Sequence, residues 1–303
     1  MRTLESLKRQ ILGAGELKSI VRTMKAMAAA NIGQYESAVG SLVDYYTSIS
    51  LGIVAYFNDK NIGPILEIEK LKDNSENSIC AIVFGSDQGF VGQFNDTLTE
   101  FVSKSLLDLP GRKEVWTVGT RIPLLLTDIG LNVTKNFPLP NSIDVVTSLI
   151  GSILINVEES HSKGTLHEFY IFHNHAIPKA MYGPKSQRLL PLDEQWRQEL
   201  TAIQWPSKKI PQVIGKNKNT LKALLSEYLF VTLFKACSES LASENYSRLA
   251  AMQRAEKNIE ELLDDVNHTY HRLRQSTIDE ELFDVVSGFE ALKNMGLHKI
   301  AKP

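Results

Sequence analysis

The feature of this sequence that most restricts its fold is a stretch of 72 residues, Lys216 to Ser287, without a single glycine or proline. Glycine and proline mark most turns, and the mean helix of a globular protein is only about 11–12 residues long. The stretch therefore predicts either one very long helix or several helices joined without the usual breakers. If it is one helix, it is roughly 105 Å long, far more than a compact domain can hold, which points to an architectural or mechanical role.

The apolar spacing within this stretch favours a single helix that packs along a partner. Ten positions follow one another at alternating steps of three and four, and only Asn245 and Glu256 among them are polar. Sustained spacing of this kind is typical of a coiled coil. The ten positions are Ala242, Asn245, Leu249, Met252, Glu256, Ile259, Leu263, Val266, Tyr270 and Leu273.

The amino-terminal segment carries a matching stripe and has no proline before Pro64. Five glycines in it, Gly13, Gly15, Gly33, Gly40 and Gly52, each cost about 1 kcal/mol in a helix interior but would let a second backbone approach. We predict that residues 1–63 and 210–295 form a long antiparallel coiled coil; a helical bundle in which both segments fold back is the alternative. The stripe consists of Leu4, Leu7, Ile11, Ala14, Lys18, Val21, Met24, Ala28, Ile32, Tyr35, Val39, Leu42, Tyr46, Ile49 and Ile53.

Between the two segments the period of the apolar residues changes. Short apolar runs at 79–84, 115–118, 131–137 and 166–173 are typical of strands, and the stretches 95–109, 121–129 and 142–159 between them are typical of helices. Alternating strands and helices predict a parallel or mixed sheet with helices on its faces. Residues 181–214 are rich in proline and are expected to be irregular. The predicted fold class is thus α/β, with a Rossmann-like domain at 64–209, the coiled coil and a tail at 296–303.

No cofactor, metal or catalytic site is predicted. The turn 85–92 (GSDQGFVG) fits neither the dinucleotide fingerprint nor the phosphate-binding loop, so its glycines are interpreted as a tight strand-to-helix junction. His173 and His175 would point to the same side of a strand, with His161 and His167 nearby. Histidines at the surface or at a sheet edge are favoured over a metal site.

Charge and cysteine usage add two expectations. Net charge is −2, which gives no sign of nucleic-acid binding, but residues 1–30 are basic and much of 260–284 is acidic. The two segments are either a complementary pair, or the basic helix faces an acidic partner.

Cys80 and Cys237 are expected to be buried thiols of a reducing compartment. The sequence has no run of 18 apolar residues, so no membrane span is expected. The amphipathic pattern begins by Leu4, so no leader peptide is expected either.

Three segments together resemble the gamma subunit of F-type ATP synthases, the central rotor shaft. They are 20–30 (IVRTMKAMAAA), 86–95 (SDQGFVGQFN), and 239–248 (ESLASENYSR) with its continuation to Gln275. Their order and spacing agree over about residues 3–291. Gln88 stands where the family usually has Arg, and Val91 where it usually has Cys. These departures suggest a divergent branch, of the alternative or Na⁺-type bacterial and archaeal kind.

The resemblance implies a non-catalytic shaft that turns inside a ring of α and β subunits. Met24 and Lys25 match the position facing an acidic lever loop of the β subunit. Four further residues match those that hydrogen-bond to the β catch loop, although the same residues could be an ordinary exposed helix face. They are Arg248, Arg274, Gln275 and Glu281. Nearby, the apolar stripe continues in a shifted frame as Ile278, Leu282, Val285, Phe289 and Leu292.

The other implied partners are the epsilon subunit and the ion-driven c-ring, whether the ion is H⁺ or Na⁺. The chain would then lie at the cytoplasmic face of a bacterial or archaeal plasma membrane, as a peripheral subunit whose membrane contact comes only through the complex. Two alternatives are a coiled-coil scaffold protein and a Rossmann-like binding domain with helical appendages. Self-association would favour the scaffold, and saturable cofactor binding would favour the binding domain.

Overall fold

The computed structural model describes residues 3–58, 78–177, 180–203, 205–207, 209 and 218–300, without the side chains of residues 180, 194, 218 and 291–300. The chain forms two compact units. The first consists of Met1–Ala26 and Met252–Pro303, and the second of Met27–Ala251. Of the predicted domain boundaries, residues 63 and 64 lie outside the described residues, as do residue 210 and the last three residues of the 296–303 tail; the domain limits remain predictions.

Two long helices contribute to both units: α1 (Leu4–Asn58), of 55 residues, and α6 (Lys218–Ile300), of 83 residues. The prediction of a single carboxy-terminal helix is confirmed, and α1 is unbroken despite its glycines. The idea that these glycines let a second backbone approach was wrong. Only at Gly52 would a Cβ meet a neighbour, the side chain of Leu224 at 3.2 Å. Nothing lies within 4 Å of a Cβ built at Gly13, Gly15, Gly33 or Gly40.

The first unit is an antiparallel pair of helix segments. Lys18 of α1 pairs with Glu260 of α6, and Lys25 pairs with Glu256, so residue numbers rise on one helix as they fall on the other. Leu7 is fully buried and Met252 is 2% exposed. In the two units together, every predicted stripe position from Leu4 to Ile53 and from Ala242 to Leu273 is buried or half-buried, as a coiled coil requires.

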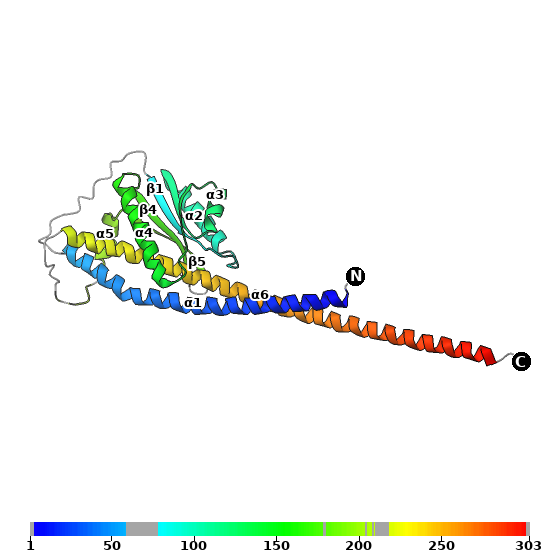
Figure 1. Ribbon diagram of the computed structural model, residues 1–303. Helices are drawn as coiled ribbons and strands as arrows, with labels where there is room; N and C mark the ends of the chain where they lie inside the picture. Colours follow the sequence, from blue (N-terminus) through cyan, green and yellow to red (C-terminus); the bar gives the residue numbers. More distant parts are fainter. Residues whose placement is uncertain are drawn as a thin grey trace. The chain divides into compact units, whose positions relative to one another are not determined.

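The second unit is built on a five-stranded sheet in the order β3-β2-β1-β4-β5 (Figure 1). The first four strands are parallel to their neighbours, and β5 runs antiparallel beside β4. The strands are β1 (Ser78–Phe84), β2 (Arg112–Val118), β3 (Val133–Phe137), β4 (Glu168–Ile177) and β5 (Ala180–Leu190). The strand order reverses between β1 and β4, as in Rossmann-like folds.

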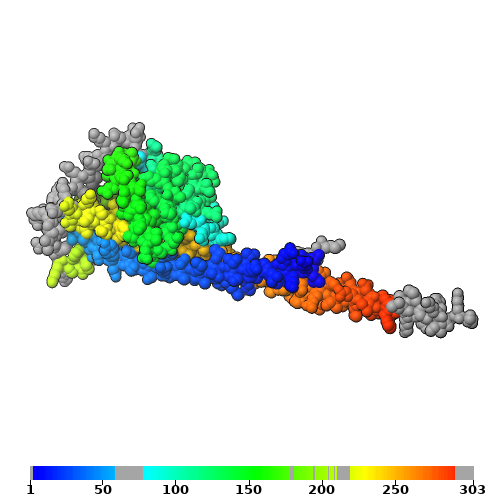
Figure 2. Space-filling model, viewed as in Figure 1, coloured from blue at the N-terminus to red at the C-terminus, as the bar shows by residue number. Residues whose placement is uncertain are grey.

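Helices cover both faces of the sheet. On one face α2 (Phe94–Leu107) and α3 (Ile122–Asp128) pack against alternate strand residues such as Ile79, Ala81 and Val83. On the other face α4 (Ile143–Ser162) packs against residues such as Ile82 and Phe84, together with part of α6. In Figure 2, α4 forms part of the green surface. The alternation along β1 is the two-residue period of a strand whose two faces are both covered.

The expectation that residues 181–214 are irregular was wrong for their first part. They contain β5 and the short helix α5 (Glu194–Thr201). Asp193 caps α5, because its Oδ1 accepts a hydrogen bond from the backbone N–H of Trp196 at 3.0 Å. The polar strand β5 is an edge strand, so its hydrogen bonds to β4 decide its conformation, and Pro184 is tolerated there.

At the end of α1, a third cluster joins α1, α5 and α6 within the second unit. Ile49 and Ile53 of α1 pack against Trp196 of α5 and against Tyr228 and Val231 of α6.

By length and composition, α1 is also apolar enough to cross a membrane, with a mean hydropathy of 1.3 in one window, and no other described helix is. Core helices meet the same criterion. The finding nonetheless differs from the expectation that no segment could span a membrane, because that expectation rested on the lack of an uninterrupted apolar run.

Candidate functional site

The carboxyl ends of β1 and β4 form the place where Rossmann-like folds bind ligands, because the strand order reverses there. The loop after β1 is held in one conformation by its own side chains. The backbone N–H of Ser86 donates to Asn95 Oδ1 at 3.1 Å, and Asn95 Nδ2 donates to Ser86 Oγ at 2.8 Å. Asp87 Oδ1 accepts from the backbone N–H of Thr120 at 2.8 Å. The polar side chains of Ser86, Asp87 and Asn95 therefore have a structural role, because they hold the loop in place.

Close packing explains the first glycine of the loop. A Cβ on Gly85 would lie 2.5 Å from the Cβ of Ile122, the first residue of α3. Phe90, by contrast, has a φ of 61° and is 69% exposed. A non-glycine residue in the left-handed region is uncommon. The loop thus combines a tightly packed base with an exposed aromatic tip.

The ligand crevice of the sheet is covered by α6. Ser240 Oγ donates to the carbonyl oxygen of Phe84, the last residue of β1, at 3.1 Å. Ser247 Oγ donates to the carbonyl oxygen of Val91 in the loop. Glu239 reaches β4, where its Oε2 lies 2.9 Å from His173 Nε2. The place that a nucleotide takes in a Rossmann enzyme is thus occupied by the chain's own helix.

Of the two histidines of β4, His173 takes part in this helix contact, whereas His175 contacts β5. His173 is 1% exposed, so the expectation of surface or sheet-edge histidines was wrong for it. Burial lowers its pKa, although Glu239 opposes that change, which favours a neutral imidazole donating from Nε2. His175 Nδ1 lies 3.0 Å from the carbonyl oxygen of Gly183. Among the described residues, no group of three His, Cys, Asp or Glu side chains is arranged to hold a metal ion.

A second buried pair lies one helical turn further along α6. Glu244 Oε1 accepts from an Nη of Arg248 at 2.5 Å, and the two side chains are 4% and 12% exposed. Burial raises the pKa of Glu244 to about 7, Arg248 opposes the rise, and Asp87 adds to it. Arg248, expected to contact a partner, is therefore mostly buried and engaged within its own helix.

In the first unit, the basic residues of α1 face acidic residues of α6. Glu256 accepts from Lys25 Nζ at 2.5 Å and from Arg22 Nε at 2.7 Å. These two hydrogen bonds, the stronger from Lys25, lower the pKa of Glu256 to about 2. Lys18 Nζ lies 2.9 Å from Glu260. The complementary-pair interpretation of the charged segments thus holds for Lys18, Arg22 and Lys25.

The remaining predicted contact residues lie on the first unit and differ in exposure. Met24 and Lys25 are half-buried, whereas Arg274, Gln275 and Glu281 are exposed. In the register set by Lys18–Glu260 and Arg22–Glu256, Arg274 lies opposite Leu4, at the start of α1. The structure therefore leaves the side chains of this part of α6 open to solvent. Whether any of the six contacts a partner remains a prediction.

The apolar stripe in the shifted frame is exposed. Ile278, Leu282, Val285 and Phe289 are 51–70% exposed, and Phe283 and Val286 add to the same part of α6. The side chain of Leu292 lies outside the described residues. Exposed apolar side chains in this number are unusual for a free surface and mark a place of contact.

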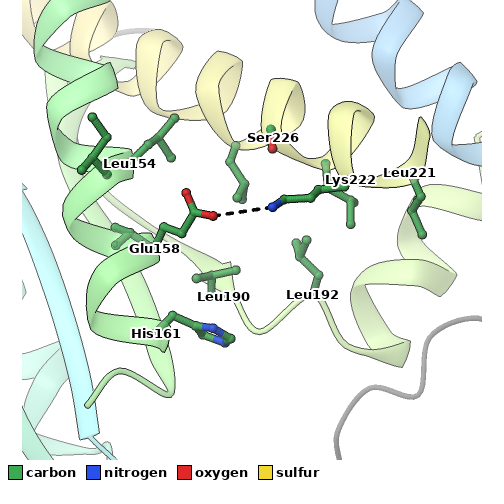
Figure 3. A pocket seen from close by; sticks show the side chains of 12 residues that line it. Leu154, Glu158, His161, Leu190, Leu192, Leu221, Lys222 and Ser226 are labelled. Atoms are coloured by element: carbon green, nitrogen blue, oxygen red, sulfur yellow. Dashed lines mark ion pairs between the residues drawn. The ribbon is translucent and has the colours of Figure 1, made fainter. Parts of the chain in front are cut away.

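A groove of about 620 Å³ opens on the second unit between α4, the end of β5 and the start of α6 (Figure 3). Leucines form much of its lining, including Leu190 and Leu192. Figure 3 shows Glu158 of α4 and Lys222 of α6 pointing toward each other across it, with 3.7 Å between Oε1 and Nζ. Both side chains are about three-quarters exposed, so this ion pair adds little stability.

Sequence reasoning missed two residues that the structure brings into these clusters. Glu244 lies four residues before Arg248, a spacing that pairs side chains on a helix and that could have predicted the pair. Glu256 was noted only as a polar exception in the apolar stripe. Its two cationic partners are more than 200 residues away in the sequence, so only the antiparallel register reveals them.

Comparisons with known proteins agree with this architecture. The family model described as ATP synthase matches residues 3–292. The chain is 26% identical to the ATP synthase gamma chain of Syntrophus aciditrophicus, over 96% of this chain and 99% of that one. It is 25% identical to the gamma chain of Aquifex aeolicus, over 95% and 97%.

Solved structures show the same fold. A chain of the Euglena gracilis mitochondrial ATP synthase, from the assembly described as OSCP/F1/c-ring, superposes with a TM-score of 0.66. It is 16% identical, with coverage of 99% of this chain and 97% of that one. A chain of the rotor of the same enzyme gives a TM-score of 0.59 at 16% identity, with coverage of 91% and 98%.

A Rossmann-like sheet carried on two long terminal helices, with the ligand crevice covered by one of them, defines the class of central-stalk proteins. The family match extends across both helices and the sheet. The chain belongs to the ATP synthase family, in which its relatives of nearly equal length are gamma chains.

Proposed function

We propose that this chain is the non-catalytic rotor shaft of an ATP synthase, which couples ion flow through a membrane c-ring to ATP synthesis or hydrolysis in a ring of α and β subunits. The observation that carries the proposal is the family match over residues 3–292, which includes both long helices and not the sheet alone. A stiff helix pair suits the transmission of torque, since its stripe positions are buried or half-buried along both helices.

The non-catalytic role is supported by the way the sheet is used. Ser240 and Ser247 of α6 are bound to the loop and strand end where a Rossmann enzyme would hold its ligand. These two hydroxyl groups, with the carbonyl oxygens of Phe84 and Val91, are therefore committed to internal contacts. We expect the purified chain to have no ATPase activity and no saturable nucleotide binding.

The proposed partners are the α, β and epsilon subunits and the c-ring. Solved structures of similar fold come from assemblies described as rotor and as F1/c-ring. Arg274, Gln275 and Glu281 are exposed and are proposed to contact the β catch loop. Met24 is proposed to face the β lever loop. Lys25 would contribute there as well, but its ammonium already pairs with Glu256, so its contact is the weaker part of the proposal.

The experiment is co-expression of this chain with the α and β subunits of the same genome. One copy of the chain is expected at the centre of each recovered complex, with ATP turnover that depends on its presence. An α/β complex whose turnover ignores the chain would contradict the proposal. Cross-linking that finds only homodimers would favour the coiled-coil scaffold instead.

The proposed location follows from these partners. The chain would be a peripheral subunit at the cytoplasmic face of a bacterial or archaeal membrane, held there by the complex. Membrane fractions should contain it when the c-ring is present. Its recovery in those fractions from cells lacking the c-ring would contradict attachment through the complex.

A further inference from the structure

Glu244 is a buried carboxylate with one cationic partner among the described residues. It is 3% exposed and lies on α6, whose neighbouring residues Leu241 and Ala242 share a core cluster with the sheet and with Tyr35 of α1. Arg248 donates to it through one Nη, while the buried Nε–H of Arg248 has no described hydrogen-bond partner. The guanidinium thus uses only part of the planar donor fork with which arginine can bind a carboxylate.

Among the described residues, the groups around Glu244 other than Arg248 do not stabilise its negative charge. Asp87, in the loop after β1, is negative and disfavours the carboxylate. Tyr35 of α1 and Cys237 of α6 face it as neutral groups, because burial raises the pKa of each. If Arg248 turned away, Glu244 would be a buried charge beside another negative charge. Such a group takes up a proton rather than remain ionised.

We propose that Glu244 is a positioning residue that holds Arg248 ready, and that Arg248 exchanges Glu244 for a carboxylate of a partner subunit while Glu244 takes up one proton from solvent. The inference rests on the proposed function, and it adds Arg248 to the contacts with the β subunit, the role that the family resemblance implies for this residue. The charges balance on both sides. Before the exchange there are a Glu244–Arg248 ion pair, a partner carboxylate and one proton. Afterwards there are a neutral Glu244 acid and an ion pair between Arg248 and the partner carboxylate.

Two features support the exchange. Arg248 keeps 12% of its side chain exposed, so the side chain lies at the edge of the buried region. The pKa of Glu244 is already about 7 with Arg248 in place, since burial outweighs the arginine. Protonation near neutral pH is therefore accessible to it, which is not so for an exposed glutamate.

The test is the pH dependence of binding between this chain and a complex of its α and β subunits. If binding takes up one proton, the affinity of the chain for the complex should fall as pH rises above 7, with a limiting slope of about tenfold per pH unit. Well below pH 7 the affinity should not depend on pH. Glu244→Gln, which cannot titrate, should bind with a level profile. Glu227→Gln, which removes an exposed carboxylate of the same helix, should keep the wild-type slope.

Equal slopes for wild type and Glu244→Gln, or a level wild-type profile, would overturn the exchange while leaving the shaft function in place. Absence of binding at every pH would instead overturn the proposed function, and the exchange with it. A second measurement uses the free chain and needs no partner. The infrared band of the protonated carboxyl that Glu244→Gln removes should titrate with a midpoint near pH 7, and a midpoint near 4.5 would overturn the proposal.

Discussion

At the scale of single residues, the second unit is organised by polar side chains that fasten α6 to the sheet. Ser240, Ser247 and Glu239 each bind a different part of it: the end of β1, the loop after β1, and His173 on β4. Each contact satisfies a buried polar group that would otherwise destabilise the fold. A helix held this way has a fixed rotation about its own axis, because its bonds leave from one face.

Gly85→Ala tests how tightly the loop base is packed. The new Cβ would lie 2.5 Å from Ile122 Cβ, and both belong to rigid backbone segments. Overpacking of this kind costs typically about 1–3 kcal/mol. The matched control is Gly151→Ala in α4, where a Cβ meets nothing within 4 Å and alanine should be neutral or stabilising by up to about 1 kcal/mol. Urea unfolding of both variants gives the two free energies, and equal values would contradict the packing.

Glu244 should give stability a distinctive pH dependence. Its pKa is raised from 4.5 to about 7 in the folded chain. Between these values the folded state binds more protons than the unfolded state, so stability falls as pH rises through this window. The loss amounts to about 3 kcal/mol, and Glu244→Gln should lack it. Unfolding free energies at pH 5 and pH 7.5 check this, and a variant with the wild-type pH difference would exclude Glu244 as its source.

At the scale of elements, the helices were the predictable part of this chain. Their apolar positions repeat along many turns, so the stripe from Leu4 to Ile53 could be read without knowing its partner. β5 could not, since its polar sequence forms a strand only through pairing with β4. The cluster around Glu256 could not be predicted either, because local sequence does not reveal which residues of α1 lie opposite Glu256 of α6. The mixed sheet with helices on both faces agreed with the prediction, because strands and helices alternate along the chain, whereas the order of the strands was not predicted.

Glu256→Gln tests the charged cluster that joins α1 and α6 in the first unit. The substitution removes the carboxylate that accepts from Arg22 and Lys25, so the nearby part of α1 should open more often. Faster amide hydrogen exchange is expected in residues 4–26 at low salt, with a smaller difference at high salt, where charge interactions are screened. Glu261→Gln is the matched control, since Glu261 pairs only locally with Lys257. Equal exchange in the two variants would contradict a role for the cluster.

At the scale of the whole molecule, the two units present different kinds of surface. In the second unit, the polar side chains of Glu239, Ser240 and Ser247 bind inward, at the crevice of the sheet. The first unit keeps polar and apolar side chains of α6 exposed, from Arg274 to Phe289. The sequence predicted that Arg274 and Gln275 are contact residues only through a family resemblance, since nothing in a helical pattern distinguishes a contact from a solvated face. Their exposure is what makes a test possible.

Replacing both Arg274 and Gln275 by alanine should separate assembly from folding. Both side chains are exposed, so unfolding free energies of the isolated chain should change by no more than about 0.5 kcal/mol each. In a complex with the α and β subunits, loss of charge-assisted hydrogen bonds to the β subunit should lower coupled turnover several-fold. Arg272→Ala is the matched control, because Arg272 is exposed two residues earlier and points to another side of α6. Two outcomes would show that Arg274 and Gln275 are part of an ordinary solvated face. The double variant could lose stability and turnover in parallel, or its turnover could be no lower than that of the control.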